Sequence, residues 1–414
     1  MKVNCAFTIC ATNYIGLAQV LERSIFEHYD ELDFYIVVAD EPKPVVKEGF
    51  EDNVLVAKDI LSYNYTERKW YEMAFKYDLT EFCTSIKPAS IKYFFNQGYE
   101  KCIYFDPDIY AFSSIKSIYD VLDNHSVVLT PHITQMEIDS TCNIKEQQLL
   151  KSGIFNLGFI GVRNNEKTFL FLDWWSKRLE DYSFHSIPEN LFTDQRWMDL
   201  IPGFFGNDLF ISLDKGMNMA PWNFHERQIR GDKGELMVEN RIKHLDILNP
   251  LIFVHFSGYK YSNLINGDIQ QKNIKSMKEY VDLDILFKSY QDALKNSSFT
   301  SYADYDYSYS FYENGTPIHP MARRLYRSIV ENKGCEENPF ICDSSVYRKT
   351  KHMGKSMVIM KDNSNNEFKR EMIIKIMNSI LILIYKIIGT RLYFKALNVF
   401  KYYGTIENHS FLLK

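Results

Sequence analysis

The sequence predicts an α/β fold with a mostly parallel central sheet and helices on both of its faces. Short apolar runs of strand length alternate with helical patterns through the first hundred residues. Strands that alternate with helices in this way form parallel sheets covered by helices. Two aspartates also follow the apolar run at residues 101–105 directly, at the position where open α/β sheets bind their ligands.

The predicted elements can be followed in order along the chain. The predicted strands are short apolar runs at residues 3–11, 34–39, 53–57, 101–105, 126–131, 154–162 and 253–256. The predicted helices carry apolar residues at helical spacing and cover residues 18–26, 87–96, 168–179 and 272–295, with one more beginning near Pro320. Residues 301–315 are rich in Tyr, Asp and Ser, and we expect a loop or an irregular cover there.

Composition excludes several classes of protein. Of the 414 residues, 46% are hydrophobic and 24% are charged, so the chain can bury a large core and is not mostly disordered. The net charge of -5 argues against a protein that coats nucleic acid, because neutralising phosphates requires a basic face. Seven cysteines without a C-x-x-C pair indicate reduced thiols, and the N-terminus lacks the apolar core of a secretory signal. We therefore expect a cytoplasmic protein.

The most specific motif is Y-F-D-P-D at residues 104–108, directly after a predicted buried strand. The carboxylates of Asp106 and Asp108 would lie close together in a partly dry crevice, which is costly without a cation. Mn²⁺ and Mg²⁺ prefer oxygen ligands and often share them with substrate phosphates. The motif therefore predicts a divalent metal site, and the alternative is an acidic turn that faces solvent.

A second segment, F-V-H-F-S-G-Y-K at residues 253–260, combines a histidine with a glycine and a lysine. His255 can supply an imidazole ligand to a metal, and Lys260 can supply a cation for a phosphate. A histidine within an apolar run is, however, more often a packed core residue. This segment alone leaves both interpretations open.

Two more segments carry polar groups in unusual places. Asn156 interrupts a β-rich run, where a polar ligand can be held. Asp194 and Gln195 form a carboxylate–carboxamide pair at a predicted helix start. The alternative for this pair is an N-cap, a role that Thr193 or Asp194 would fill well.

Together, in this order and at these spacings, the four segments resemble glycosyltransferase family 8. This family of GT-A fold enzymes includes glycogenin and bacterial lipopolysaccharide galactosyltransferases. The matching segments read YFDPD, FNLG, TDQ and HFSGYK, and the opening ICATNYIGLAQVLERSI resembles the first strand and helix of the family. The chain differs from the family pattern at Thr12, at Leu157 and at Tyr261-Ser262. The resemblance covers residues 1–265 and implies a Rossmann-like GT-A domain there.

The resemblance also implies roles for individual residues. It implies a metal site made of Asp106, Asp108 and His255, with Asp106 also near the nucleotide ribose. The residues implied to bind the nucleotide sugar are Ala11, Thr12, Asn13 and Tyr14 at the nucleoside, and Gly258 and Lys260 at the diphosphate. The residues implied to surround the donor sugar are Asn156, Asp194 and Gln195. Lys87 matches the family's basic donor-binding residue only loosely.

The implied activity is metal-dependent transfer of a sugar from a nucleotide-diphosphate sugar, expected to be a UDP-sugar, to a glycan or lipid-linked acceptor. Retention of configuration is expected from the family, whereas an inverting enzyme would need a carboxylate base such as Asp194. We expect a part in surface polysaccharide biosynthesis. One alternative is a Mg²⁺-dependent phosphohydrolase of the haloacid dehalogenase type, although Tyr110 occupies its Thr/Val position. Another is a non-catalytic carbohydrate-binding protein on a transferase fold.

The chain after residue 265 is expected to differ in character from the part before it. We expect a helical or irregular cover at residues 266–362. A basic amphipathic C-terminal segment is expected at residues 363–414, after a linker at residues 362–367. Within this segment, residues 368–403 combine many isoleucines and leucines with flanking Lys and Arg. An in-plane amphipathic helix at an anionic membrane fits this pattern. The alternatives are docking on the protein's own core or on a dimer partner.

Overall fold

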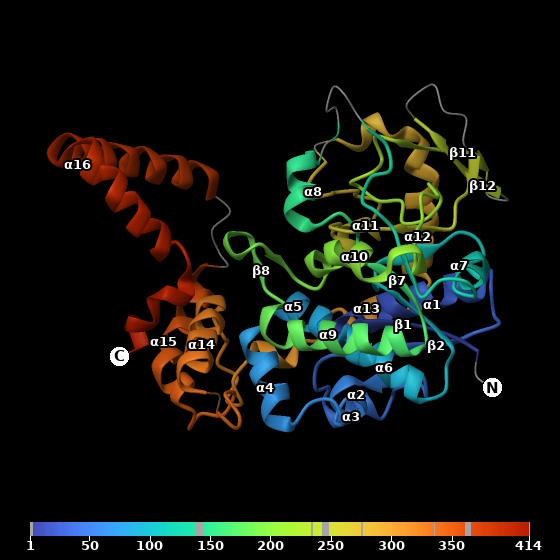
Figure 1. The fold of residues 1–414 in the computed structure, drawn as a ribbon, viewed down its shortest axis with the longest axis horizontal. Helices are drawn as coiled ribbons and strands as arrows, with labels where there is room; N and C mark the ends of the chain where they lie inside the picture. The colour runs from blue at the N-terminus through green and yellow to red at the C-terminus, as the bar shows by residue number, and fades with distance from the viewer. Residues whose placement is uncertain are drawn as a thin grey trace. The chain divides into compact units, whose positions relative to one another are not determined.

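The computed structural model describes residues 3–136, 142, 144–232, 235–241, 248–274, 276–334, 336–360 and 366–413 (Figure 1). By compactness the chain divides into two units. The first unit comprises Met1–Asn64 with Leu79–Ser308, and the second comprises Tyr65–Asp78 with Tyr309–Lys414. The domain limits predicted from the sequence lie at residues 265 and 362. They rest on motifs and composition, so the division by compactness does not test them and they stay predictions.

The first unit is built around a seven-stranded sheet in the order β10-β6-β7-β4-β1-β2-β3. Its strands are β1 Asn4–Cys10, β2 Asp33–Val38, β3 Val54–Val56, β4 Lys101–Phe105, β6 Val127–Leu129, β7 Phe159–Arg163 and β10 Leu209–Ile211. Neighbouring strands run parallel except at β7, which is antiparallel to both β4 and β6. The prediction of an α/β fold with a mostly parallel sheet is therefore confirmed.

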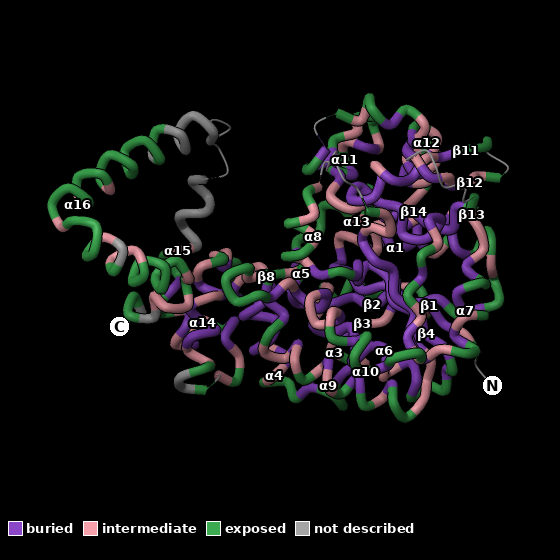
Figure 2. The backbone as a smooth tube through the Cα atoms, turned by 45° about the horizontal axis from the view of Figure 1, so that its top comes forward, coloured by how far each residue is buried: buried purple, intermediate pink, exposed green. Residues whose placement is uncertain are grey.

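Helices flank this sheet, and the longer ones bury an apolar stripe along one face. They are α1 Ile15–Phe26, α2 Pro44–Lys47, α3 Ala57–Ile60, α5 Leu79–Ser85, α6 Lys87–Asn96, α7 Lys116–Val121, α8 Glu146–Ser152, α9 Glu166–Tyr182, α10 Ile201–Phe205, α11 Tyr261–Leu264, α12 Asp284–Lys295 and α13 Phe299–Tyr302. The helix predicted at 87–96 has the same bounds as α6. In Figure 2 the backbone of β1 and β4 is purple, because these strands are buried on both faces.

Smaller antiparallel sheets complete the first unit. The pair that matters for the site is β5, Ile109–Ala111, with β14, Phe253–His255. Its register places Ile109 opposite His255. The others are β11 Arg227–Asp232, β12 Glu235–Asn240 and β13 Leu248–Pro250, and the pair β8 His185–Ser186 with β9 Leu191–Phe192.

Two predicted elements are shorter than expected. The strand predicted at 154–162 begins only at Phe159, because the chain turns at Leu157 and Gly158. The helix predicted at 272–295 is α-helical only in α12, after 3-10 turns at Met277–Glu279 and Val281–Leu283. The side chain of Gln271 accepts hydrogen bonds from the backbone N–H groups of Asn273 and Ile274, which competes with a helix there.

The second unit is helical, as predicted for the C-terminal extension. It contains α4 Glu67–Lys76, α14 Pro320–Lys333, α15 Ser345–Met360, α16 Asn366–Tyr403 and a 3-10 segment at Ile406–Leu413. The guanidinium of Arg323 donates to the carbonyls of Ala74, Phe75 and Tyr77 and so satisfies the C-terminal end of α4. Of the predicted linker, residues 362–365 lie outside the described residues, and the remainder already belongs to α16.

Helix α16 is exposed and is broken at Gly389, where φ is 69° and ψ is 170°. Its described apolar side chains include exposed Ile374, Ile376, Ile382 and Leu383, and Figure 2 draws most of the helix green. By length and composition alone, the stretch Ile374–Tyr393 could cross a membrane, with a mean hydropathy of 1.3. The helix predicted in this segment is therefore present.

Candidate metal centre

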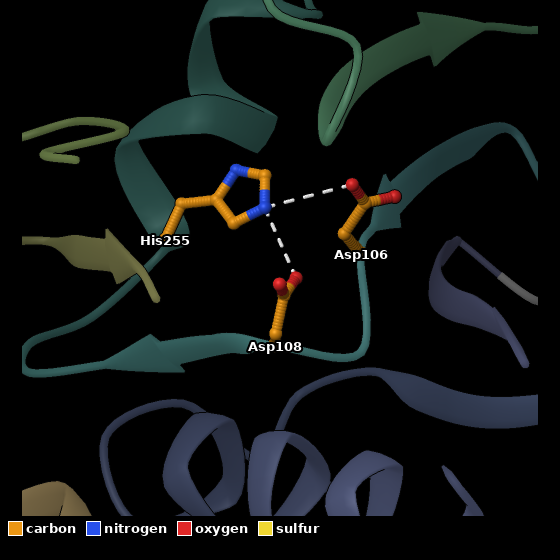
Figure 3. A group of neighbouring side chains, drawn as sticks. All are labelled: Asp106, Asp108 and His255. Atoms are coloured by element: carbon orange, nitrogen blue, oxygen red, sulfur yellow. Dashed lines mark ion pairs between the residues drawn. The ribbon is translucent and has the colours of Figure 1, made fainter. Parts of the chain in front are cut away.

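The centre of the candidate site is formed where β4 ends and the chain turns into β5. Asp106 and Asp108 lie in this turn, and the β5–β14 pairing brings His255 beside them (Figure 3). The Nε2 atom of His255 lies 3.0 Å from Asp108 Oδ1 and 3.6 Å from Asp106 Oδ2. One ligand atom from each residue lies within 4.8 Å of the others. The structure thus brings together the three residues named as metal ligands.

The orientation of the His255 ring is set by Asn156. The Oδ1 atom of Asn156 accepts hydrogen bonds from the backbone N–H of Gly158 at 3.2 Å and from Asn218 Nδ2 at 3.1 Å. The same oxygen lies 3.2 Å from His255 Nδ1. An oxygen that already accepts from two donors requires Nδ1 to carry the proton, so the lone pair of neutral His255 is on Nε2, facing the carboxylates.

Gly158 is required by the approach of the histidine. A Cβ at this position would lie 2.4 Å from His255 Cε1, far inside van der Waals contact. The glycine of the F-N-L-G segment therefore makes room for the imidazole. The approach of His255 is thus the physical reason for a glycine at position 158.

The three groups shift each other's pKa values in opposite directions. Burial raises the pKa of Asp106, with Asp108 adding to the shift. Burial would also raise the pKa of Asp108, but His255 and hydrogen bonds from His255 and Tyr261 hold it below its ordinary value. Burial opposes protonation of His255, yet the two carboxylates raise its pKa. The arrangement therefore favours a positive charge between the carboxylates.

Two tyrosines position the carboxylates. The hydroxyl of Tyr104 donates to Asp106 Oδ1 at 2.6 Å. The hydroxyl of Tyr261 lies 2.8 Å from Asp108 Oδ2 and 2.9 Å from the carbonyl of Phe256. Each carboxylate thus keeps one oxygen tied to a tyrosine and turns the other toward His255.

A second cluster of predicted residues lies behind the first. The ammonium of Lys87 pairs with Asp194, donates to the carbonyl of Leu157 at 2.7 Å and lies 4.1 Å from the Tyr104 ring centroid. Lys87 and Asp194 are both buried. Asp194 occupies the N-cap position of the 3-10 segment Gln195–Leu200, but its side chain makes no capping hydrogen bond. Its carboxylate is used for the ion pair instead.

Gln195 connects this cluster to the metal centre. Its Oε1 accepts from the backbone N–H of Leu157 at 3.1 Å and lies 3.4 Å from Asn156 Nδ2, and its Nε2 donates to the carbonyl of Ser152. Asn156, Asp194 and Gln195 therefore lie in one group of polar side chains, which is joined through Leu157 and Lys87. Their implied contact with a donor sugar stays a prediction.

The predicted nucleoside-binding segment lies at the end of β1. Ala11 precedes a 3-10 turn at Thr12–Tyr14, and the Tyr14 ring meets the Tyr261 ring edge-on at 6.1 Å. Thr12 donates through its backbone N–H and its hydroxyl to Asp40 Oδ1, at 3.0 and 2.8 Å. The Oδ1 atom of Asn13 is buried and has no partner among the described residues.

Asp40 was not singled out from the sequence, although it follows a buried strand closely, as Asp106 does. It lies two residues beyond β2, is 1% exposed, and its second oxygen accepts from the backbone N–H of Ser308 at 3.2 Å. Burial raises the pKa of this carboxyl. Asp40 therefore supplies a buried acidic group directly behind Thr12.

Gly258 and Lys260 are less closely tied to the centre. Gly258 has φ of 76° and lies in the turn after β14, so a side chain there would be strained. The side chain of Lys260 is exposed at the start of α11. The stem of Lys272 passes 3.0 Å from the position of a Cβ at Gly258, so Lys272 is a further cation beside this turn that the sequence interpretation missed.

Trp222 and Asn218 are two more residues that the sequence interpretation missed. The ring centroid of Trp222 lies 5.2 Å from that of His255, and its Nε1 is buried without a partner in the described part of the chain. Asn218 is 1% exposed with φ of 54°, and its Oδ1 likewise has no partner there. The segment that contains Asn218 and Trp222 carries no recognisable sequence motif, because only the fold brings it to His255.

The donor set fits a divalent cation. Two carboxylate oxygens and one imidazole nitrogen converge on one point, and the proton of His255 is held on the far nitrogen by Asn156. Mn²⁺ accepts such mixed oxygen and nitrogen ligands, and Mg²⁺ accepts the oxygens. None of the six described cysteines belongs to this cluster.

The fold and the site define an α/β protein with an Asp–Asp–His cluster at the carboxyl end of its central sheet. No family model matches the chain. The chain is 26% identical over 227 residues to the uncharacterized protein YfnF of Bacillus subtilis, covering 52% of this chain and 68% of YfnF.

Several solved structures similar to the chain are glycosyltransferases. The galactosyltransferase LgtC, in complex with donor and acceptor sugar analogs, matches with 14% identity and a TM-score of 0.40 over 71% of this chain and 96% of LgtC. The bifunctional glycosyltransferase WbbM matches with 14% identity and a TM-score of 0.41, over 73% of this chain and 50% of WbbM. GlyE of Streptococcus pneumoniae TIGR4 matches with 13% identity and a TM-score of 0.36, over 76% of this chain and 67% of GlyE.

Proposed function

We propose that the protein is a metal-dependent glycosyltransferase that moves a sugar from a nucleotide-diphosphate sugar, most simply a UDP-sugar, to a glycan or lipid-linked acceptor. The observation that carries the proposal is the Asp106–Asp108–His255 cluster with its lone pair directed by Asn156. Such a cluster at the end of a sheet strand suits a cation that is shared with a diphosphate.

In this proposal each predicted residue has a defined task. Asp106, Asp108 and His255 hold Mn²⁺ or Mg²⁺, which neutralises charge on the leaving diphosphate. Residues 11–14 line the nucleoside pocket, and Gly258 and Lys260 contact the diphosphate. Asn156 and Gln195 orient the donor sugar, and Lys87 holds Asp194 in place behind it.

The proposed reaction retains the configuration of the anomeric carbon. The bond from the anomeric carbon to the diphosphate oxygen breaks, and its electron pair leaves with that oxygen. The acceptor hydroxyl oxygen bonds to the anomeric carbon, and its proton passes to the leaving phosphate. The buried ion pair with Lys87 keeps Asp194 from acting as a free base, which favours retention over inversion. NMR of the product's anomeric proton tests this, and an inverted product would contradict it.

A binding experiment tests the proposed function. Thermal unfolding is measured with a panel of nucleotide sugars, with and without Mn²⁺. A ligand at 100 times its dissociation constant adds about 2.7 kcal/mol to the free energy of unfolding, so a selective rise in Tm that needs Mn²⁺ is expected. Asp108→Ala should abolish this rise, whereas Asp120→Asn, which removes an exposed carboxylate on α7, should keep it. Phosphatase activity without nucleotide dependence, or no response to any donor, would overturn the proposal.

We also propose that the protein acts at the cytoplasmic face of a membrane, in the assembly of surface polysaccharide, through peripheral contact of α16 with anionic lipid. The exposed apolar side chains of this helix lie together with Lys375, Lys386, Arg391 and Lys395. Apolar burial and attraction to anionic headgroups act together on such a segment.

Vesicle sedimentation tests the membrane contact. The protein should bind phosphatidylglycerol vesicles and be released by high salt, and it should bind phosphatidylcholine vesicles weakly. Replacing Lys375, Lys386 and Lys395 with Glu should abolish binding, whereas replacing Lys47 and Lys177 on other surfaces should not. Equal binding to both vesicle types, or retention of membrane binding at high salt, would contradict peripheral electrostatic contact.

A further inference from the structure

Helix α16 consists of two arms joined at a break. The first arm covers residues 366–388 and the second covers residues 390–403, and Figure 1 draws a bend between them. The φ of 69° and ψ of 170° at Gly389 belong to a backbone region that is essentially reserved for glycine. The side chain of Tyr385 reaches across the break. Its hydroxyl lies 3.1 Å from Thr390 Oγ1, and its ring meets the Tyr393 ring edge-on at 5.3 Å, so both arms contribute contacts that support the bend.

Each arm carries polar residues on one side and apolar residues on the other. The polar residues are Lys375, Ser379 and Lys386 in the first arm and Arg391, Lys395 and Asn398 in the second, and all six are exposed. At about 100° per residue, the first three lie within about 40° of one another around the helix axis and the last three within about 60°. Met377 and Phe400 lie on the opposite, apolar sides of the two arms, and both are exposed.

The two polar sides would lie on opposite faces of an unbroken helix. Counted from Lys375 at about 100° per residue, Arg391 would lie at about 160° and Lys395 at about 200°. An unbroken α16 would therefore place the cations of the second arm on the same face as the apolar Met377 of the first. Such a helix could not turn both apolar sides toward one flat surface. Because Gly389 interrupts the helix, the second arm is freed from this constraint.

The charge and polarity of α16 indicate the surface that it fits. Residues 366–403 contain seven Lys and Arg against two Glu, whereas the whole chain has a net charge of -5. The stretch Ile374–Tyr393 has a mean hydropathy of 1.3, and all of its residues are described and none is buried. The interface of an anionic bilayer attracts cations and accepts exposed apolar side chains. A straight spanning helix fits less well, because this stretch contains the break as well as Lys375, Lys386 and Arg391.

We propose that the break at Gly389 allows both arms of α16 to lie in one anionic membrane surface, each with its apolar side in the lipid and its cations at the headgroups. The inference rests on the proposed membrane contact. It goes beyond that contact by assigning it to both arms and by making it depend on the backbone conformation of one glycine.

Vesicle sedimentation of the full chain tests the role of the break. Gly389→Ala disfavours the observed φ and ψ and favours an unbroken helix. Its affinity for phosphatidylglycerol vesicles should fall about tenfold or more, because one arm leaves the surface and each Lys or Arg there contributes about fivefold. Two alanines inserted after residue 389 of this variant turn the second arm by about 200° and should restore most of the affinity. Four inserted alanines turn it by about 400°, which leaves the polar sides opposed, and are the matched control.

A spin label on each arm shows which arm lies in the lipid. Nitroxide side chains are introduced at positions 377 and 400 as unnatural amino acids, so that the native cysteines stay in place. In the bound wild-type protein both labels should be protected from a water-soluble nickel chelate, whereas in Gly389→Ala only one should be.

The outcomes separate the inference from the proposal on which it rests. Unchanged vesicle affinity in Gly389→Ala, equal affinity of the two-alanine and four-alanine variants, or an accessible label at position 400 in the bound wild-type protein would overturn the inference alone. No binding of the wild-type chain to phosphatidylglycerol vesicles would instead overturn the proposed membrane contact, and the inference with it.

Discussion

The Oδ1 atom of Asn156 lies 3.2 Å from Nδ1 of His255, on the side of the ring opposite Asp106 and Asp108. Because Asn156 Oδ1 is an acceptor, this contact fixes the proton of neutral His255 on Nδ1 and leaves Nε2 as the ligand atom. Asn156 therefore positions a metal-ligand residue from outside the cluster, in the manner of the partners that orient metal-bound histidines.

Asn156→Ala should weaken Mn²⁺ binding about 10- to 100-fold, the usual cost of losing such a partner. The affinity is measured by titration with Mn²⁺ and detection of free ion by electron paramagnetic resonance. Asn266→Ala, which changes an exposed amide outside the site, should leave the affinity unchanged. Unchanged Mn²⁺ affinity in Asn156→Ala would mean that the ring is held by packing alone.

Lys87→Met should lower the free energy of unfolding by about 3–5 kcal/mol, because it leaves the buried Asp194 carboxylate without a counterion. Chemical denaturation measures the loss. The double variant Lys87→Met with Asp194→Asn should recover part of it. Lys92→Met on the same helix breaks the pair with Asp173, whose side chain is 59% exposed, and should cost no more than about 1 kcal/mol. Equal losses for Lys87→Met and Lys92→Met would show that the buried pair is not the cause.

Gly16→Ala should destabilise the first unit. A Cβ at Gly16 in α1 would lie 2.5 Å from the Cα of Phe299 at the start of α13, and backbone cannot give way cheaply. Such overpacking costs about 1–3 kcal/mol. Gly203→Ala in α10 has open space around it and should be neutral or stabilising by up to about 1 kcal/mol. Thermal unfolding compares the two, and equal Tm values would refute the close approach of α13.

Glu22→Gln should stabilise the protein at pH 8 and have no effect near pH 4. Burial and the nearby Glu51 raise the pKa of Glu22 from 4.5 to about 7, although Asn53 donates to its carboxylate. The folded state therefore binds more protons than the unfolded state between these values, and stability falls as pH rises from 4.5 to about 7. The glutamine keeps the acceptor for Asn53 and removes this loss. A Tm difference between variant and wild type that is constant from pH 4 to 8 would contradict the raised pKa.

Much of the first unit follows from local patterns in the sequence. Apolar runs of strand length predicted β1, β2, β4 and β14, and the helical spacing at residues 87–96 predicted α6, because burial of one stripe or one face imposes a period on the chain. The helix predicted at 272–295 was partly wrong, because the side chain of Gln271 takes over the backbone N–H groups that would have begun it.

The candidate site was likewise predictable from the sequence only in part. Asp106 and Asp108 follow a strand within three residues, which is a local feature of the chain. The sequence alone therefore identified both as candidate metal ligands. The contribution of His255 depends on the antiparallel pairing of β5 with β14, and its tautomer depends on Asn156, about a hundred residues away in the chain. The roles of Asp40 and Trp222 also depend on contacts between distant segments.

The sequence by itself determined the class of fold, the two carboxylates and the character of the C-terminal helix. Only the tertiary structure decided that Lys87 neutralises Asp194, that Gly158 makes room for His255, and that the Trp222 ring packs against His255. The physical reason is that periodicity and turn chemistry act over a few residues. Ion pairs, ring contacts and unpaired buried donors depend instead on which distant segments the packing of the core brings together.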